Sequence, residues 1–403
     1  MRISTQQMHQ SALTLMLDQQ ARLAKTQQQL ASGKRFTTAA EDPAGATQAM
    51  SLTRELAVTE QYQSNAEAVR ARQSTQENAL ASTTELLHSV RELMVQANSD
   101  TLNATDRQSL SLSLSQQVDA LVGLANTSDG SGEYLFSGFQ SGTQPFARNG
   151  QGQVAYQGDQ GQRMLGIGPG ITTAMTDSGA AVFQQLRAGN GTFVTAANAA
   201  NSGSGSISAG QVTGAWQAGR YSLAFTQTAA GQPIAYEVRD VVANTQVTTG
   251  AYVSGAAIQF NGASVTVTGT PAAGDSFSVE SAGYRDMFAV IQDVAQVLGS
   301  TADGSAAQAQ RHTALNRGLA ELDGALDHVL LQRARVGSRL NLVESQTQAN
   351  DAFKLTATET LSTVQDLDYA EATTRLQTQQ VVLEAAQQSY IKIQGLSLFK
   401  FLS

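Results

Sequence analysis

The sequence predicts a mainly α-helical protein with a small β-rich domain inserted between its two helical halves. Two observations support this fold class. Apolar residues recur at steps of three and four in both end thirds, as they do in long packed helices. Most of the 35 glycines and four of the five prolines lie between Gly123 and Gly283, among short alternating runs typical of strands and turns. We therefore expect long terminal and antiparallel helices in a bundle or coiled coil, with β-hairpins beside them.

The composition excludes several classes of function. The 403 residues are 41% hydrophobic, which is enough for real cores, and they carry a formal net charge of −8. Such a chain lacks a basic surface that could neutralise a phosphate backbone, so we expect no nucleic acid partner. It contains no cysteine, which excludes thiol catalysis, disulfides and cysteine-ligated metal. No run of about 18 apolar residues occurs, so we expect neither membrane insertion nor a cleaved signal peptide.

The first helical pattern has a seam that mixes leucine with glutamine. Its predicted core positions step by 3, 4, 3, 4 and 3: Leu13, Met16, Gln20, Leu23, Gln27 and Leu30. Gly33 is predicted to end this helix in a left-handed conformation, with Lys34 and Arg35 near the negative end of its dipole. Asp42 before Pro43 predicts the N-cap and first residue of a second long helix. Thr105 and Gln108 suggest a capping box for a third.

The joint between the first two helices also invites a chemical interpretation. Gly33, Lys34 and Arg35 could cradle a phosphate, with Glu41 and Asp42 as metal ligands. A phosphate-binding loop needs a second glycine five residues earlier and a serine or threonine after the lysine, and neither is present. The four histidines are scattered, without metal-ligand spacing. We therefore expect no catalytic, cofactor-binding or metal site, and no cofactor.

The middle of the chain is predicted to form strands. The runs "EYLFSGF", "GQVAYQGD" and "RMLGIG" suggest hairpins at about residues 134–171, with "GIGPG" as a turn. Residues 191–282 read as a separate β-rich outer domain, because four further runs alternate at period two: "RYSLAFT", "IAYEVRD", "AIQFNGASVTVTG" and "DSFSVES". The helical bundle domain would then comprise residues 37–190 and 283–364.

The C-terminal third returns to helical periodicity. One seam runs through Leu315, Leu319, Leu322, Leu326, Val329, Arg333, Val336, Leu340 and Val343. A last seam follows an N-cap at Asp368 and comprises Tyr369, Ala372, Leu376, Gln379, Leu383, Ala386, Tyr390 and Ile393. Residues 1–36 and 365–403 are thus expected to form a terminal coiled-coil domain.

Two such terminal helices would bury too little apolar surface if they packed only against each other. Paired only with each other, they would leave Leu15, Leu17, Val381, Val382, Leu398, Phe399 and Phe401 in water. Ordering a residue costs about 1 to 2 kcal/mol, which this limited burial would not offset. We therefore expect the ends to be disordered in a monomer and helical when other subunits surround them.

Specific motifs resemble the flagellin superfamily, most closely its hook–filament junction members. They are "MRISTQQM" at the start, "QLASGKRFTTAAEDPAGATQAMSL" from Gln29, "ANTSDGSGEYLFSGFQSGTQPF" from Ala125 and "DLDYAEATTRLQTQQVVLEAAQQSYIKIQGLSLFKFL" at the end. The resemblance implies a structural, non-enzymatic adaptor at the extracellular hook–filament junction. Its implied partners are hook-associated protein 1, flagellin, its own copies in a ring, and an export chaperone at the C-terminus. Export would follow the flagellar type III route without a cleaved signal peptide.

The resemblance also implies which residues act in assembly. An inner tube would be formed by both chain ends, with an assembly interface of Leu13, Leu17, Leu23, Leu30, Leu376, Leu383, Tyr390, Ile393, Leu398 and Phe401. The joint between this tube and the outer helices would comprise Gly33, Lys34, Arg35, Asp42 and Pro43. Two alternatives stay open at this point: a filament flagellin, and a secreted enzyme carried on flagellin-like ends with its chemistry in residues 191–282.

Overall fold

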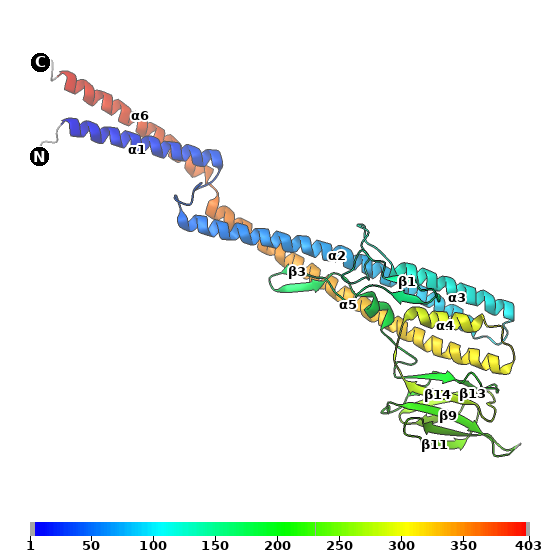
Figure 1. The fold of residues 1–403 in the computed structure, drawn as a ribbon. Helices are drawn as coiled ribbons and strands as arrows, with labels where there is room; N and C mark the ends of the chain where they lie inside the picture. Colours follow the sequence, from blue (N-terminus) through cyan, green and yellow to red (C-terminus); the bar gives the residue numbers. More distant parts are fainter. Residues whose placement is uncertain (1–4, 230, 400–403) are drawn as a thin grey trace. The chain divides into compact units, whose positions relative to one another are not determined.

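The protein is described here by a computed structural model, which covers residues 5–229 and 231–399 (Figure 1). The chain divides into two compact units. The terminal unit combines the chain up to residue 64 with the chain from residue 345, and the central unit comprises residues 65–344. Long helices and a β-rich insertion confirm the predicted fold class. The finer division into three domains stays a prediction.

The terminal unit is entirely helical apart from its joint segments. It contains α1 (Thr5–Ser32), the start of α2 (Pro43–Ala97), the end of α5 (Ser305–Gln365) and α6 (Tyr369–Phe399). Helices α1 and α6 lie side by side, shown in blue and red in Figure 1. Its one cluster of buried apolar side chains, within the described residues, lies where α2 and α5 meet the joint: Phe36, Ala46 and Ala49, with Leu361 and Val364 against them.

The central unit has a much larger core. Helices α2 and α5 pack there with α3 (Ala104–Ala125) and α4 (Met287–Leu298). The predicted seam of α5 is confirmed, because its residues from Leu315 to Val343 are all buried or half-buried. Helix α4 was not predicted, although seven of its twelve residues are buried. Aromatic rings at Phe146, Phe183 and Phe288 pack at centroid distances of 5.2 to 5.9 Å beside it.

The N-terminus of α3 differs from the prediction. Asn103 is the N-cap: its side chain accepts a hydrogen bond from the backbone N–H of Asp106 at 2.9 Å, and the Asp106 carboxylate accepts one from the backbone N–H of Asn103. The predicted box of Thr105 and Gln108 is therefore wrong by two residues. Asparagine and aspartate satisfy the first free N–H groups earlier in the chain, so the helix begins before Thr105.

Two hairpins lie beside the helices, as predicted. Strand β1 (Phe146–Arg148) pairs with β2 (Val154–Tyr156), and β3 (Met164–Gly168) pairs with β4 (Ile171–Ala174). The turn between β3 and β4 contains Gly170, whose φ of +73° suits glycine. The segment "EYLFSGF" is not a strand: it forms turns, and only Tyr134 makes an isolated bridge, to Ser128.

The β-rich domain consists of two small antiparallel sheets that share a core. The first has the order β11-β10-β9-β14-β6, with β6 (Phe193–Ala197), β9 (Arg220–Thr226), β10 (Ala235–Asp240), β11 (Thr245–Ala251) and β14 (Ser276–Ser281). The second joins β7 (Ser206–Ile207), β8 (Gln211–Val212), β12 (Ala257–Phe260) and β13 (Ala263–Thr268). All four predicted runs form strands, whereas β6, β7, β8 and β11 were missed. A two-stranded ladder of β5 (Leu186–Arg187) and β15 (Tyr284–Arg285) closes the insertion, after a π-helical turn, η1 (Ala180–Gln184).

Candidate assembly interface

Three side-chain hydrogen bonds join α1 to α6. Gln19 donates its side-chain N–H to the Gln379 carbonyl oxygen at 3.3 Å, and the Thr26 hydroxyl donates to the Gln379 side-chain oxygen at 2.9 Å. Arg375 donates to the side-chain oxygen of Gln29 at 3.0 Å. Hydrogen bonds of this kind set the register of two helices but add only about 1 kcal/mol each. The pair is therefore aligned without being strongly held.

Every second residue of the α1 seam lies one position earlier in the chain than predicted. The side chains that turn toward α6 are half-buried or buried and include Ala12, Met16, Gln19, Leu23 and Thr26. The predicted core positions Leu13, Gln20 and Gln27 are exposed. The pattern of apolar residues was misleading because Leu13 belongs to a different face, while polar Gln19 and Thr26 occupy the seam through their hydrogen bonds.

The seam of α6 was predicted more accurately. Ala372 is fully buried, and Leu376, Gln379, Leu383, Ala386 and Tyr390 are half-buried. Tyr369, at the start of the predicted seam, is instead exposed. Its helix begins at an N-cap as expected, because Asp368 accepts a hydrogen bond from the backbone N–H of Glu371 at 3.1 Å.

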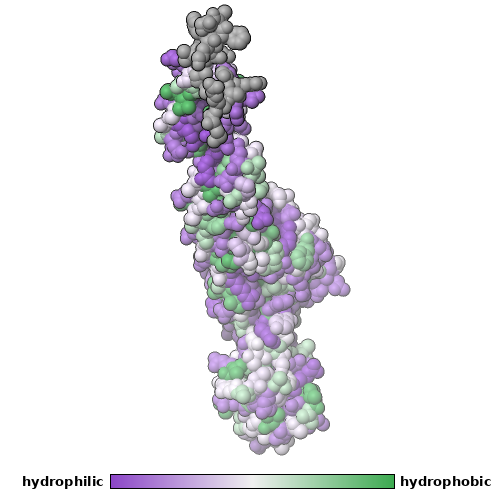
Figure 2. Space-filling model, turned by 90° about the vertical axis from the view of Figure 1, so that its left-hand side faces the viewer, coloured by the Kyte–Doolittle hydropathy of each residue, from purple (hydrophilic) through white to green (hydrophobic). Residues whose placement is uncertain are grey.

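Apolar side chains remain exposed on the outer faces of both helices. Leu13 is 49% and Leu17 57% exposed. The exposed fractions of Leu15, Val381, Val382 and Ile391 lie between 48% and 69%. Among the side chains that the structure describes, Ala372 is the one buried apolar residue of α1 and α6. Figure 2 shows apolar residues, in green, scattered between polar ones on the visible face of the chain. The described parts of the two helices thus leave six large aliphatic side chains exposed, which another molecule could cover.

The predicted interface residues therefore fall into three groups. Leu13 and Leu17 lie on the exposed outer face of α1. Leu23, Leu30, Leu376, Leu383 and Tyr390 are half-buried. Ile393 and Leu398 lie on α6, but their side chains are outside the described part, as is the whole of Phe401.

The joint is a short bridge between two chain segments distant in sequence. Lys34 forms an antiparallel bridge with Asp366, and the backbone N–H of Arg35 donates to the Gln365 carbonyl oxygen at 2.8 Å. Gly33 follows the last residue of α1 with a φ of +68°, and its N–H donates to the Gln29 carbonyl oxygen. This is the geometry of the predicted helix-ending glycine.

Asp42 and Pro43 also have their predicted geometry at the start of α2. The Asp42 carboxylate accepts the backbone N–H of Gly45 at 2.9 Å, as an N-cap does, and Pro43 is the first helical residue. Arg35 lies 3.1 Å from the same carboxylate. The Gly45 N–H, and then the Arg35 guanidinium, lower the pKa of Asp42 below its ordinary value of 3.8. The two cations of the joint thus act through backbone pairing and an ion pair.

A groove of about 520 Å³ lies beside the joint, which we call the joint groove. Its lining is mostly apolar and small, with two cations among it: Lys34, Phe36, Thr37, Thr38, Ala39, Ala46, Ala49, Met50, Thr53, Arg54, Ala57 and Gln365. Neither Lys34 nor Arg54 has an ion-pair partner within the described residues. The groove was not predicted, since it forms only when the loop after α1 folds beside the first turns of α2, with Gln365 at its edge.

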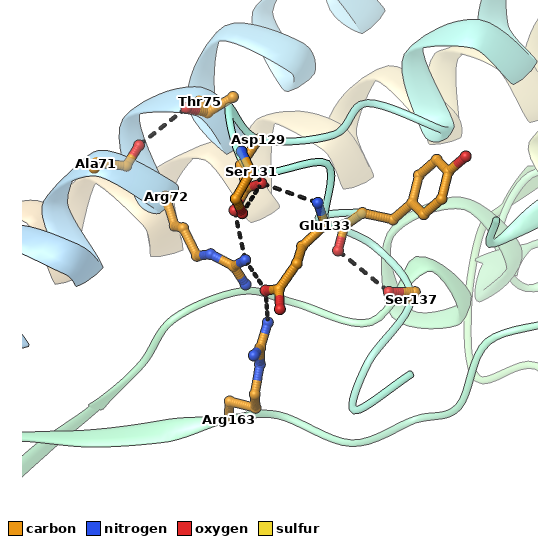
Figure 3. Close-up of polar contacts among 9 residues, drawn as sticks. Ala71, Arg72, Thr75, Asp129, Ser131, Glu133, Ser137 and Arg163 are labelled. Carbon is orange, nitrogen blue, oxygen red and sulfur yellow. Dashed lines mark hydrogen bonds and ion pairs between the residues drawn. The ribbon is translucent and has the colours of Figure 1, made fainter. Parts of the chain in front are cut away.

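An ionic cluster in the central unit anchors the loop that follows α3 (Figure 3). Arg72 of α2, whose side chain is buried, pairs with Asp129 at 2.5 Å and with Glu133, and Arg163 pairs with Glu133 at 3.0 Å. Asp129 also accepts the backbone N–H groups of Ser131 and Glu133. No local pattern in the sequence marks these four charges, because they lie on three separate segments.

Hydrogen bonds decide the protonation of this cluster. Burial alone would raise the pKa of Asp129, but hydrogen bonds from Ser131, Glu133 and Arg72 outweigh it and hold that pKa well below 3.8. The Arg163 guanidinium, aided by Arg72, lowers the pKa of Glu133 against the effect of burial. Both carboxyls are therefore charged at neutral pH and serve as structural ties.

No group of three or more histidines and carboxylates is placed to hold a metal ion in the described ranges. Nor is any helix there long and apolar enough to cross a bilayer.

Comparison with known proteins adds a family context. A model of the bacterial flagellin N-terminal helical region matches residues 3–141, and one of the D2-like domain of flagellar hook-associated protein 1 matches residues 196–281. The chain is 24% identical over 401 residues to flagellar hook-associated protein 3 of Escherichia coli (strain K12), covering 99% of each protein. A flagellin of Clostridium tyrobutyricum is 30% identical, but over 119 residues, or 30% of this chain and 32% of that protein.

Solved structures agree along most of the chain. The crystal structure of flagellar hook-associated protein 3 from Legionella pneumophila is similar with a TM-score of 0.74 and 30% identity, covering 78% of this chain and 98% of that one. FlgL of Xanthomonas campestris is similar with a TM-score of 0.71 and 33% identity, covering 77% of this chain and 99% of that one.

Proposed function

The chain belongs to the family of flagellar hook-associated protein 3, and from this premise we propose that its terminal helices join hook to filament by docking into an axial tube of related subunits. As a member of this family it is a structural protein of the bacterial flagellum and not an enzyme. It acts outside the cell, at the flagellar junction, in association with other flagellar components.

Two alternatives raised by the sequence lose support. The flagellin match is confined to 119 residues, whereas the match to hook-associated protein 3 of Escherichia coli extends over 401. A filament flagellin is therefore the poorer description. The family is structural, which argues equally against a secreted enzyme in residues 191–282.

One observation supports the docking proposal above all others: α1 and α6 bury a single apolar side chain between them within their described parts. A helix of this length in water derives most of its stability from packing an apolar face. The exposed leucines and valines on both helices supply such a face, but they need another molecule to cover it. Related subunits arranged around a common axis would cover it.

The finer partners follow from the same geometry. We propose that hook-associated protein 1 lies on one side of a ring of copies of this chain and flagellin on the other. Before assembly, the exposed apolar side of α6 is proposed to bind an export chaperone, which would keep it from aggregating. Export is proposed to follow the flagellar type III route, with the N-terminus retained.

Removal of the C-terminal end tests this proposal. A variant that lacks residues 396–403 keeps the cores of both units, so the purified protein should melt as the full chain does. Cells that produce this variant as their sole copy should carry hooks without filaments. Normal filament attachment by the truncated protein would refute the docking proposal.

A further inference from the structure

An exposed aromatic side chain stands on a rigid loop of the central unit. Phe139 is 62% exposed, yet its ring lies against the backbone of Gly161, where a Cβ atom would come within 2.1 Å of it. Its backbone N–H donates to the Asp159 carboxylate, at 3.0 and 3.1 Å to the two oxygens. The loop thus presents a large apolar group and keeps its position.

Further contacts fix the support of this loop. Gly138 has a φ of +72° and approaches Asp159 so closely that a Cβ atom would collide with it. The Tyr156 hydroxyl lies 2.9 Å from the Phe136 carbonyl oxygen and 2.6 Å from that of Asp159. An aromatic group that is already immobilised loses little entropy on binding, which is the property of an interface anchor.

The joint groove offers the space and the apolar walls that suit an aromatic side chain. Ala46, Ala49 and Ala57 leave space in its walls, Phe36 forms an apolar side, and Met50, 64% exposed, can adapt to a guest. A volume of about 520 Å³ lies in the range that encloses small apolar ligands. Arg54 also lines the groove, and a guanidinium attracts the face of an aromatic ring.

The loop that carries Phe139 and the joint groove also have opposite charges. The N–H groups of Phe139 and Gly161 lower the pKa of Asp159, so a carboxylate stands directly beside the ring at neutral pH. Lys34 and Arg54 in the joint groove have no ion partner within the described residues. An anionic loop that carries an aromatic ring therefore matches a cationic groove that lacks a guest.

We propose that the joint groove of one copy of this chain receives Phe139 of a second copy. The inference rests on the proposed function, because it supplies a contact between neighbouring subunits. Anchor and groove are different surfaces of the same chain, so the contact is heterologous, and repeated heterologous contacts generate rings or helices.

Cysteine cross-linking tests this proposal, because the chain has no cysteine of its own that could form a competing disulfide. Gln140 is exposed next to Phe139, and Ala57 lines the groove from an exposed position. The double variant Gln140→Cys with Ala57→Cys should form disulfide-linked multimers in two samples: the purified full-length chain at high concentration, and flagella from cells with this variant as their sole copy. Each single variant measures chance pairing.

Adding Phe139→Ala to the double variant should lower the cross-linked yield about tenfold, the loss expected of an interface anchor. Phe139 is exposed, so this variant should melt as the parent does. The inference would be overturned if neither sample formed a product that requires both cysteines. It would also be overturned if Phe139→Ala left the cross-linked yield unchanged. A cross-linked partner other than this chain would assign the groove to another occupant and also overturn it.

The two samples separate this inference from the proposed function. If the chain is present in flagella without a pair-dependent product, the inference falls and the function stands. If the purified chain cross-links but never enters flagella, the contact between copies stands and the junction function falls.

Discussion

The backbone N–H of Leu367 donates a hydrogen bond to the carbonyl oxygen of Gly33 at 3.0 Å, which ties the end of α1 to the segment before α6. Gly33 can take part because its φ is +68°, and Tyr369 closes the space beside it: a Cβ atom would lie 2.8 Å from the Tyr369 hydroxyl oxygen. The joint therefore depends on the absence of a side chain at this position.

We predict that Gly33→Ala weakens the joint. The left-handed conformation costs an alanine about 1 to 2 kcal/mol, and Tyr369 must move as well. Cells with this variant should lose filaments more readily under shear, while the export of the protein is unchanged. Gly123→Ala on α3 is the matched control, because a Cβ there meets no atom within 4 Å. Equal filament loss in both variants would contradict the prediction.

Leu17→Asp should block assembly and leave folding intact. Leu17 is 57% exposed on α1, so its replacement disturbs neither core, but a charge there would be buried in the proposed tube. The variant should be absent from isolated flagella and have the same melting temperature as the parent. Gln27→Asp introduces the same charge at an exposed position of the same helix. If Leu17→Asp entered flagella normally, Leu17 would lie outside the interface.

Arg72→Met should destabilise the central unit by about 3 kcal/mol, the low end of the range for breaking a buried ion pair. We choose the low end because the Glu133 side chain is 39% exposed and solvent screens its charge. Chemical denaturation of the purified chain measures the change. Arg70→Met removes an exposed pair to Glu344 from the same helix and should cost no more than about 1 kcal/mol.

The same cluster should make the central unit sensitive to acid. The pKa values of Asp129 and Glu133 lie below their unfolded values of 3.8 and 4.5, so folding favours the charged forms. Their contribution is complete above the unfolded pKa values and is lost as the pH falls through the lower folded ones. Melting temperatures at several pH values should thus drop below about pH 4. The drop should be smaller in Arg72→Met; an equal drop would exclude the cluster as its cause.

The isolated chain should lose its ends to proteases. We predict rapid removal of about the first 35 and the last 35 to 40 residues from the monomer, because α1 and α6 bury so little. Mass spectrometry of the resistant fragment checks this result. Slowly exchanging amides near Leu23 and Leu383 in the monomer would contradict it.

Periodicity in the sequence was sufficient for the long helices and for strands β9, β10, β12, β13 and β14 of the β-rich domain. The steps of three and four that predict the seams of α5 and α6 are visible locally, since one helix face repeats every few residues. The caps at Asp42 and Asp368 and the turn at Gly33 could also be predicted from the sequence, because each depends on neighbouring residues. The seam of α1 was harder to predict, because its register relies on hydrogen bonds from Gln19 and Thr26 to Gln379, which lies 353 to 360 residues away in sequence.

Tertiary structure alone decided the features that join distant segments. The joint groove combines residues 34–57 with Gln365, the Arg72 cluster unites three segments, and Asp159 and Gly161 fix the position of Phe139. No local pattern marks such sites, since they are created by chain crossings and not by repeats along one element. The sequence by itself thus determined the long helices, the β-rich insertion between them and the family, while the folded chain determined the register of α1 against α6, the Arg72 cluster and the walls of the joint groove.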